Sequence, residues 1–363
     1  MVLIRASGAG TFDQAPREGG GMSTRSRPLV SICMPGYNVE ATLVHAVESI
    51  FQQTYDNIEV ILVDDGSTDA TEAIARKFTD RRFSYERNAQ NMGGYQTMNK
   101  AIGLASGEFV AVYHTDDIYG TEIVAKEAAY LERHPAVGAV FCLSRFMDHD
   151  GQIYGQMTLP TLFKGRQTLT YDEVFPFLLR NKNILFCCPT FMARRTVLES
   201  VGLFDGGTYD VAADLDMWIR ILRRYPVAVI DEPLMSYRHS KSQWSSRYSR
   251  LRTTPELYFA IMDHYLEVDR WQTKLSKSDL TEYAFHRHDD DTRRAGNMVI
   301  IGDYEGAMKL VRTPFPWRTL LTNLRRRKFR VLLMQATIVV GLALGAGRLL
   351  APLLVRTEYG GKL

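Results

Sequence analysis

The sequence predicts an α/β fold with a largely parallel, Rossmann-like sheet that carries helices on both faces. Strand-like apolar runs alternate three times with segments of helical spacing between residues 29 and 117. Each run is apolar at successive positions, which is typical of strands that are covered on both sides. Polar turns close the runs, so the ends of several strands carry candidate binding residues.

The composition excludes several classes of protein. Of the 363 residues, 45% are hydrophobic and 23% are charged, which excludes a disordered chain, a collagen and a disulfide-stabilised scaffold. The four cysteines lack C-x-x-C spacing, which indicates reduced, structural thiols. Residues 1–28 are rich in Gly, Ser and Arg and lack the apolar segment of a signal peptide, so we expect a disordered leader on a cytoplasmic protein.

Three short segments begin the predicted sheet. Residues 29–34 (LVSICM) form an apolar run that a Pro-Gly pair closes, which predicts a buried strand. Residues 40–53 place apolar side chains three and four positions apart, which predicts a helix. Residues 58–63 (IEVILV) predict the second strand, which stops at the polar run 64–69.

The alternation continues beyond that polar run. A short helix is predicted through residues 74–78, with Ser67 or Asp69 as its cap. A loop then leads to a second helix that ends near Ala105. Residues 108–113 (EFVAVY) predict the next strand.

Polar residues follow the ends of three predicted strands, at 35–40, 64–69 and 114–117. Ligands bind beyond the carboxyl ends of the strands in parallel α/β sheets, so these segments are expected to line one crevice. The carboxylates there repel one another unless a cation or a hydrogen-bond donor lies between them. Mg²⁺ or Mn²⁺ bridging a diphosphate meets this need, because both ions prefer oxygen ligands. The carboxylates are Asp64, Asp65, Asp116, Asp117 and Asp214.

Seven segments resemble, in order, the signature series of family 2 glycosyltransferases. They are VSICMPGYNVE (30–40), VDDGSTD (63–69), NMGGYQTMN (91–99), YHTDD (113–117), FCCPTFMARRTVLESVGLFD (186–205), ADLDMWIRIL (213–222) and DEPLMSYRHS (231–240). The resemblance covers residues 28–242. It implies a GT-A fold, a nucleotide-sugar donor, Mg²⁺ or Mn²⁺, and hexosyl transfer with inversion at the anomeric carbon.

The resemblance also implies roles for the matching residues. Asp214 stands where the family places its general base, and Asp116 and Asp117 match its metal and diphosphate motif, with Asp117 as the direct metal contact. His239 is implied as a further contact to the metal or the diphosphate, and the alternative is a histidine satisfied at a strand end. The implied donor contacts are Pro35, Tyr37, Asn38, Glu40, Asp64 or Asp65, Asn91 and Gly93, where a Cβ would crowd the nucleotide.

Trp218 follows Asp214 by one helical turn. Residues four positions apart lie on the same face of a helix, so Trp218 is placed either to stack on an acceptor sugar or to pack in the core.

Two positions depart from the family pattern. His114 stands first in a motif that often reads Asp-x-Asp-Asp, and Ala213 stands where the base motif commonly has Glu. The Q-x-x-R-W motif of processive synthases is absent from the sequence, so transfer of single sugars is expected. A sugar nucleotidyltransferase is disfavoured because no Gly-rich phosphate loop follows the first strand. A catalytically inactive module that binds nucleotide sugars is the alternative.

Two predicted parts follow the GT-A domain at 29–242. Residues 243–325 are expected to be helical, with the cluster at 286–291 (HRHDDD) as a solvated helix face in preference to a metal site. Residues 326–357 combine basic residues with an apolar run at 331–347. That run stands at the lower limit for a membrane span, and the alternatives are a helix in the membrane interface or one packed on the body.

The charge is distributed unevenly along the chain. Ten Lys or Arg and no Asp or Glu lie between Lys309 and Arg356, although the net charge is only +3. A basic segment beside an apolar run favours a membrane surface over nucleic acid as a partner. We therefore expect a protein at the inner face of the cell membrane, with a glycan or lipid-linked acceptor in surface polysaccharide or glycolipid synthesis.

Overall fold

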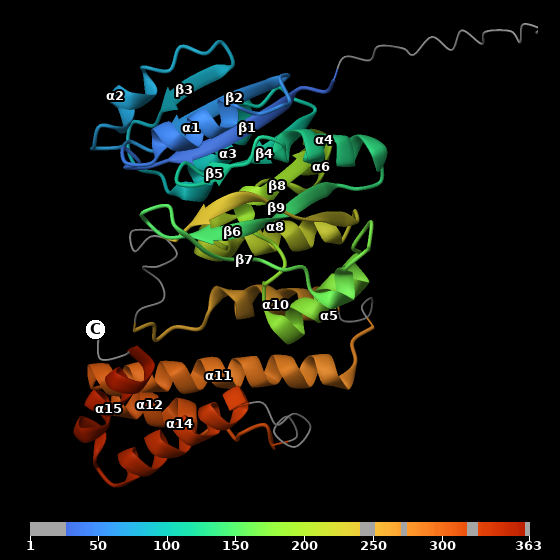
Figure 1. The fold of residues 1–363 in the computed structure, drawn as a ribbon. Helices are drawn as coiled ribbons and strands as arrows, with labels where there is room; N and C mark the ends of the chain where they lie inside the picture. The colour runs from blue at the N-terminus through green and yellow to red at the C-terminus, as the bar shows by residue number, and fades with distance from the viewer. Residues whose placement is uncertain (1–26, 240–250, 270–273, 318–325, 360–363) are drawn as a thin grey trace, which may run out of the picture.

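The structure is a computed structural model that describes residues 27–239, 251–269, 274–317 and 326–359. A sheet domain forms one part of the molecule, and a layer of helices from the C-terminal part of the chain lies beside it (Figure 1). The predicted disordered leader falls almost wholly on residues outside the described ranges.

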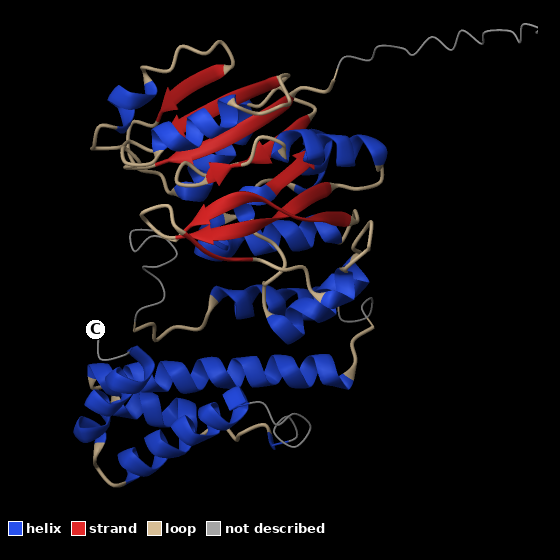
Figure 2. Ribbon diagram, viewed as in Figure 1, coloured by secondary structure: helices blue, strands red, loops and turns tan. Residues whose placement is uncertain are grey.

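Nine strands in the described residues form one mixed sheet (Figure 2). The order is β3-β2-β1-β4-β8-β6-β9-β5, with β7 paired to β6. The pairs among β3, β2, β1 and β4 are parallel, whereas β8 runs antiparallel to both of its neighbours. The strands are β1 (Val30–Gly36), β2 (Ile58–Asp64), β3 (Phe83–Arg87), β4 (Phe109–Val112), β5 (Ile118–Tyr119), β6 (Ala139–Met147), β7 (Ile153–Gln156), β8 (Phe191–Arg194) and β9 (Val227–Arg238).

Helices cover both faces of this sheet, as predicted. Ile32 and Met34 of β1 pack with α1 and α4, whereas Cys33 points to the other face and packs with α3 and α8. The helices of this part are α1 (Leu43–Phe51), α2 (Thr71–Ala75), α3 (Gly94–Leu104), α4 (Ile123–Arg133), α5 (Tyr171–Asn181), α6 (Arg195–Val201), α7 (Gly206–Tyr209) and α8 (Ala213–Leu222), with short 3₁₀ turns η1 (Thr161–Phe163), η2 (Cys188–Thr190) and η3 (Asp210–Ala212).

Strand β3 was not predicted from the sequence. Its five residues, FSYER, are half-buried or exposed and lie at the edge of the sheet beside β2. Periodicity detects strands through runs of buried side chains, so a short edge strand of this composition gives little signal.

The C-terminal helices are α10 (Leu257–Val268), α11 (Lys277–Ile301), α12 (Tyr304–Val311), α14 (Arg326–Ala343) and α15 (Gly347–Tyr359). Helix α11 contacts α5 of the sheet domain as well as α12, α14 and α15. It therefore joins the two parts of the molecule. The prediction of a helical segment followed by a basic and apolar one fits these elements.

The cluster at 286–291 is not a solvated helix face, and that prediction was wrong. His288, Asp289 and Asp290 are almost fully buried on α11. Asp290 pairs with Arg252 at 2.5 Å, and the His288 ring bonds to Gln335 of α14. These groups face in different directions, as helical geometry requires, and their partners come from other segments or, for Asp289, from Arg293 one turn further along α11.

Lys328 also departs from the expected basic surface. Its ammonium group is buried, lies 2.8 Å from a carboxylate oxygen of Glu282 and sits over the ring of Phe285. One charge of the basic run therefore ties α14 to α11. None of the helices in the described ranges combines the length and the apolar character that a membrane crossing requires.

Glu127 of α4 generates a prediction about stability. The side chain is fully buried, and burial raises its pKa well above the usual value while Tyr113 donates a hydrogen bond of 3.0 Å to it. The folded protein therefore holds a proton on Glu127 that the unfolded chain releases above about pH 4.3. Its contribution to the free energy of unfolding falls as pH rises, by up to about 1.4 kcal/mol per pH unit.

Replacing Glu127 by Gln removes this dependence, so Glu127→Gln should gain stability relative to the wild type between pH 5.5 and 7.5. Urea unfolding at the two pH values measures the difference, with exposed Glu132→Gln on the same helix as the matched control. Parallel pH profiles for wild type and Glu127→Gln would contradict the assignment.

Candidate functional site

The loops that follow β1, β2 and β4 meet at one edge of the sheet, as the parallel pairing of these strands requires. The backbone N–H of Asp65 donates to the carbonyl of Gly36, and the Thr115 hydroxyl donates to the carbonyl of Pro35 at 3.1 Å. Hydrogen bonds therefore hold the loop of the predicted metal contacts against the loop that carries predicted donor contacts.

Asp64 and Asp65 are both buried, and each fixes a different segment. Asp64 accepts hydrogen bonds from the Ser67 N–H at 2.9 Å and the Tyr85 hydroxyl at 2.8 Å, which closes the turn after β2. Asp65 accepts from the N–H groups of Met92 and Gly93 at 2.8 and 2.9 Å, so it holds the loop that leads into α3.

The segment around Asn38 and Glu40 is bonded to the turn that follows β2. The Asn38 side chain accepts from the Thr68 N–H at 2.8 Å, and the Glu40 carboxylate accepts from the Ala70 N–H at 2.9 Å. Asp69 accepts from the N–H groups of Thr71 and Glu40 and so holds the turn before α2, whose N-cap residue is Ala70 and neither Ser67 nor Asp69 as predicted. These side chains tie together the loops after β1 and β2, which form the rim of the candidate site.

Tyr37, Asn91 and Gly93 lie at the accessible part of this rim. Tyr37 is 43% exposed, and Asn91 is exposed. Gly93 has a φ of +94°, a conformation that favours glycine, and no protein atom lies within 4 Å of the position that a Cβ would take. The backbone conformation therefore accounts for glycine at position 93 within the chain itself.

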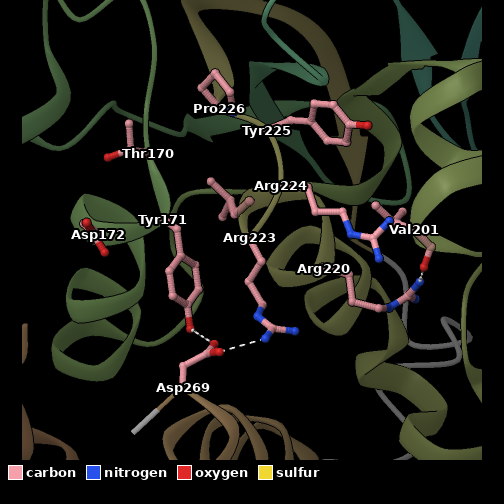
Figure 3. A pocket seen from close by; sticks show the side chains of 11 residues that line it. Thr170, Tyr171, Asp172, Val201, Arg220, Arg223, Arg224, Tyr225, Pro226 and Asp269 are labelled. Atoms are coloured by element: carbon pink, nitrogen blue, oxygen red, sulfur yellow. Dashed lines mark hydrogen bonds and ion pairs between the residues drawn. The ribbon is translucent and has the colours of Figure 1, made fainter. Parts of the chain in front are cut away.

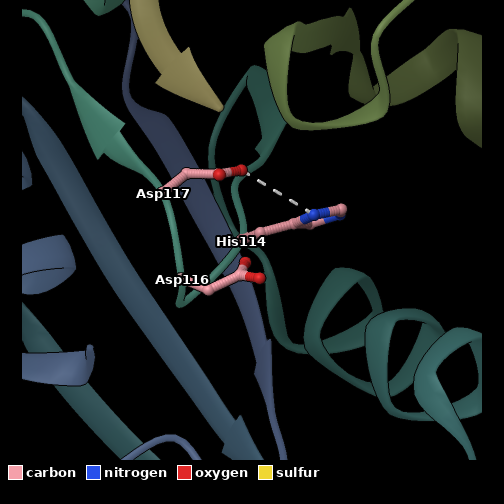
Figure 4. A group of neighbouring side chains, drawn as sticks. All are labelled: His114, Asp116 and Asp117. Carbon is pink, nitrogen blue, oxygen red and sulfur yellow. Dashed lines mark ion pairs between the residues drawn. The ribbon is translucent and has the colours of Figure 1, made fainter. Parts of the chain in front are cut away.

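His114, Asp116 and Asp117 form a compact group beyond β4 (Figure 4). One ligand atom from each residue lies within 4.8 Å of the others. Asp117 is fully buried; its Oδ1 accepts from the Arg238 N–H at 2.8 Å, and its Oδ2 lies 3.9 Å from His114 Nδ1. Within the described part of the chain, no hydrogen bond reaches Oδ2.

The group fits a divalent cation. Burial, reinforced by the charge of Asp116, raises the pKa of Asp117 well above its usual range, and burial lowers the pKa of His114. A buried carboxylate oxygen without a donor is costly unless a proton or a cation compensates its charge. Two carboxylates and a neutral imidazole are ligands that Mn²⁺ accepts, and the carboxylates suit Mg²⁺ as well.

Two residues of this site were missed as site residues from the sequence. The sequence identifies His114 only as a departure from the family motif, yet its ring lies with Asp116 and Asp117 in the compact group. Arg238 donates from its guanidinium to the carbonyls of Asp116 and His149 at 2.9 and 3.0 Å, in addition to its backbone bond to Asp117. Its signal was its place in the segment DEPLMSYRHS, one residue before the histidine that was chosen.

His239 does not belong to the group of His114, Asp116 and Asp117 in the described residues. It is exposed at the end of β9, where its ring stacks on Phe146 with centroids 5.3 Å apart and bonds to the Tyr154 hydroxyl. The structure thus favours the strand-end alternative for His239.

Asp214 lies at the start of α8 and is half-buried. Burial raises its pKa to about 6, although the N–H of Leu215 donates to it at 2.7 Å. The charges of Asp214 and Asp117 both raise the pKa values of the adjacent thiols Cys187 and Cys188. Both carboxylates therefore lie close enough to Cys187 and Cys188 for their charges to act on the same two thiols.

The thiols themselves are not nucleophiles at neutral pH. Burial is the largest cause of the raised pKa values of Cys187 and Cys188, so both remain protonated. Cys33 and Cys142 are buried in the cores on the two faces of the sheet. All four cysteines are free, which agrees with the prediction of structural thiols.

Trp218 does not line the crevice, and the hypothesis that it stacks on an acceptor sugar was wrong. The indole is fully buried and packs against Phe141, Phe191 and Phe204. The spacing of four from Asp214 is correct for a shared helix face, but that face turns into the core after the first turn of α8.

Comparisons with known proteins agree with this geometry. The family described as "Glycosyl transferase family 2" matches residues 31–202. The chain is 28% identical over 220 residues to the Escherichia coli UDP-Glc:alpha-D-GlcNAc-diphosphoundecaprenol beta-1,3-glucosyltransferase WfgD, covering 60% of this chain and 80% of WfgD.

Solved structures share the fold. Residues 1–349 of S. aureus TarS in complex with UDP-GlcNAc align with a TM-score of 0.55 and 17% identity, covering 87% of this chain and 92% of that one. The mannosyltransferase PcManGT from Pyrobaculum calidifontis, in complex with GDP-Man and Mn²⁺, aligns with a TM-score of 0.50 and 20% identity, covering 89% and 88%. The mixed sheet with helices on both faces is the GT-A arrangement.

The acidic group makes a prediction about metal binding. Asp117→Asn replaces one of the two carboxylates of the group by a neutral amide. The affinity for Mn²⁺ should therefore fall by at least about tenfold. Enhancement of the relaxation rate of water protons by protein-bound Mn²⁺ measures the affinity directly. The control is Asp150→Asn in the exposed group Asp148, His149 and Asp150. Equal losses in both variants would show that the ion does not prefer the buried group.

Proposed function

The chain belongs to glycosyltransferase family 2, and on that premise we propose that it transfers one sugar at a time, with inversion, from a nucleoside diphosphate sugar to an acceptor hydroxyl. That it is a glycosyltransferase acting on nucleotide sugars follows from its family and relatives. The observation that carries the finer proposal is Asp214 at the start of α8, a carboxylate with a pKa of about 6 whose charge acts on Cys187, as does the charge of Asp117.

Asp214 is suited to remove the proton of the acceptor hydroxyl. Its pKa is high enough for proton transfer and low enough for the carboxylate to be ionised at neutral pH. The acceptor oxygen attacks the anomeric carbon from the face opposite the diphosphate, and the bond from that carbon to the phosphate oxygen breaks. The bonding electrons leave with the nucleoside diphosphate, and the proton stays on Asp214.

Three further groups of residues take part in the proposed reaction. Asp117, Asp116 and His114 would hold Mg²⁺ or Mn²⁺, which when bound supplies positive charge to the diphosphate oxygens as negative charge develops there. PcManGT was solved with Mn²⁺, which supports the choice of ion. The proposed nucleoside and donor contacts are Pro35, Tyr37, Asn38, Glu40, Asp64, Asp65, Asn91 and Gly93, which line or brace one rim.

Exposed apolar side chains on the C-terminal helices support a proposal for where the enzyme lies in the cell. Phe329, Leu333 and Val340 are exposed on α14 at intervals of four and seven residues, so they share one face of the helix. Exposed Leu349 and Leu353 continue apolar surface on α15, and Arg348 beside them is exposed as well. We name these five apolar residues the α14–α15 face.

An exposed apolar face with flanking cations binds the interface of an anionic bilayer. We therefore place the enzyme at the cytoplasmic side of the cell membrane, working on an acceptor of surface polysaccharide or glycolipid synthesis. The name of WfgD describes an acceptor that is a sugar on a diphosphoundecaprenol, which supports a lipid-linked acceptor here.

Replacing Asp214 by Asn should leave donor binding unchanged and lower turnover by about 10²–10⁴-fold, because the acceptor proton loses its base. Wild-type turnover at saturating donor should fall about tenfold per pH unit below pH 6 as Asp214 becomes protonated.

Turnover is measured as release of nucleoside diphosphate, and donor binding as thermal stabilisation by UDP, GDP, dTDP or CMP with Mn²⁺. Asp231→Asn, at an exposed position of β9, is the control variant. Full turnover in Asp214→Asn would assign the base to another group.

The α14–α15 face makes a separate prediction. Burying one Leu side chain contributes about 1.5–3 kcal/mol, so the double variant Leu333→Asp with Leu349→Asp should lower the partition coefficient onto anionic vesicles by at least about tenfold. Sedimentation with phosphatidylglycerol vesicles measures the coefficient. Leu280→Asp, at an exposed position on α11 outside the face, is the control. Unchanged partitioning of the double variant would refute the proposed surface.

A further inference from the structure

The described residues line two large cavities outside the acidic group. One, of about 660 Å³, lies at the C-terminal end of α8, the end opposite Asp214, and Arg220, Arg223 and Arg224 line it (Figure 3). Arg223 pairs with Asp269, Arg220 donates to the Val201 carbonyl, and Arg224 donates to the Ser200 carbonyl. These three cations already have partners inside the fold, so they give no indication of an anionic ligand.

The other cavity, of about 890 Å³, lies among η3, α10, α11, α14 and α15. Apolar side chains make up most of its wall, among them Leu257, Ile300, Met334 and Leu354. The basic residues at the cavity are paired: Arg252 with Asp290 and Glu256, and Arg293 with Asp289. The chemistry of this cavity therefore favours an uncharged, apolar ligand, and its volume suits a ligand of ordinary size.

One end of the cavity lies beside the start of α8. Val211 and Ala212 line it, and they immediately precede α8, which carries Asp214 in its first turn. The Tyr95 hydroxyl donates to the Val211 carbonyl at 3.3 Å, and the charge of Asp214 acts on that same tyrosine. Asp210, also in the wall, has a φ of +41°, a strained conformation of the kind that gathers at functional sites.

The other end of the cavity reaches the C-terminal helices. Met334 follows Leu333 on α14, and Leu354 follows Leu353 on α15. Leu333 and Leu353 belong to the exposed α14–α15 face, while their neighbours turn inward to the cavity. The wall of the cavity therefore includes residues of α14 and α15 as well as the residues just before Asp214.

We propose that this cavity binds the apolar aglycone of the acceptor, a long alkyl or isoprenoid chain, and so presents the sugar at its end to Asp214. The proposal rests on the proposed glycosyl transfer and names the substrate class of the same site. It accounts for the largely apolar wall beside the residues that precede Asp214, and for the pairing of Arg252 and Arg293 with carboxylates of the protein.

The test uses dodecyl β-D-glucoside below its micellar concentration, titrated into the full chain by calorimetry. Methyl β-D-glucoside is the probe for the sugar alone. Dodecyl glucoside should bind with a negative heat-capacity change, as burial of apolar surface requires, and methyl glucoside should bind at least about tenfold more weakly.

Ala260→Trp fills the cavity from an exposed position on α10, and Thr254→Trp fills it from the loop before that helix. Either should weaken dodecyl glucoside binding by at least about tenfold. Ala284→Trp, at an exposed position of α11 outside the cavity, should leave binding unchanged. Two filling variants at exposed positions, each checked by thermal unfolding, separate loss of the site from loss of the fold.

The outcomes separate the two proposals. Full affinity in both filling variants, with loss of binding in Leu333→Asp, would place the alkyl chain on the outer face and overturn the cavity site. Loss of binding in the filling variants supports the cavity site even where no nucleotide sugar is turned over, a result that would overturn the proposed function alone. Equal affinities for methyl and dodecyl glucoside would overturn the cavity site while leaving donor turnover untouched.

Discussion

The bond between Arg238 and the Asp116–Asp117 turn is the interaction on which the site depends. Asp116 and Asp117 follow a strand of the parallel half of the sheet, whereas Arg238 ends β9 on the other side of β8. The backbone of Arg238 holds the Asp117 carboxylate, and its guanidinium holds the carbonyls of Asp116, Asp148 and His149. A single residue thus fixes the carboxylates where two differently paired regions of one sheet meet.

Buried carboxylates that disfavour folding are concentrated at the candidate site. Asp117 is fully buried and Asp214 is half-buried, and burial raises the pKa of each. Buried carboxylates of this kind lower the stability of the empty protein, and ligands that neutralise them recover that free energy on binding. Elsewhere the chain satisfies its buried charges internally, as the pair between Arg252 and Asp290 shows. Paired buried charges therefore stabilise the fold, whereas the charges of Asp117 and Asp214 are compensated when a ligand binds.

The sequence predicted the parallel strands and the converging carboxylates because both leave local patterns, namely apolar runs and polar turns at their ends. It could not determine what depends on distant partners. The HRHDDD cluster is polar in sequence and buried in the structure, because Arg252 and Gln335 come from segments about 40 residues away on either side. Trp218 and His239 were chosen by spacing and by motif, yet packing on the aromatic neighbours Phe141 and Phe146 decides their surroundings.

Helix α11 is shared by both parts of the molecule. Its 25 residues rise about 37 Å at 1.5 Å per residue, and it contacts α5 of the sheet domain as well as α14 and α15. It lies crosswise between the sheet domain and the last helices of the chain (Figure 1). Because one continuous helix packs against both parts, its packing sets the orientation of α14 and α15 relative to the sheet.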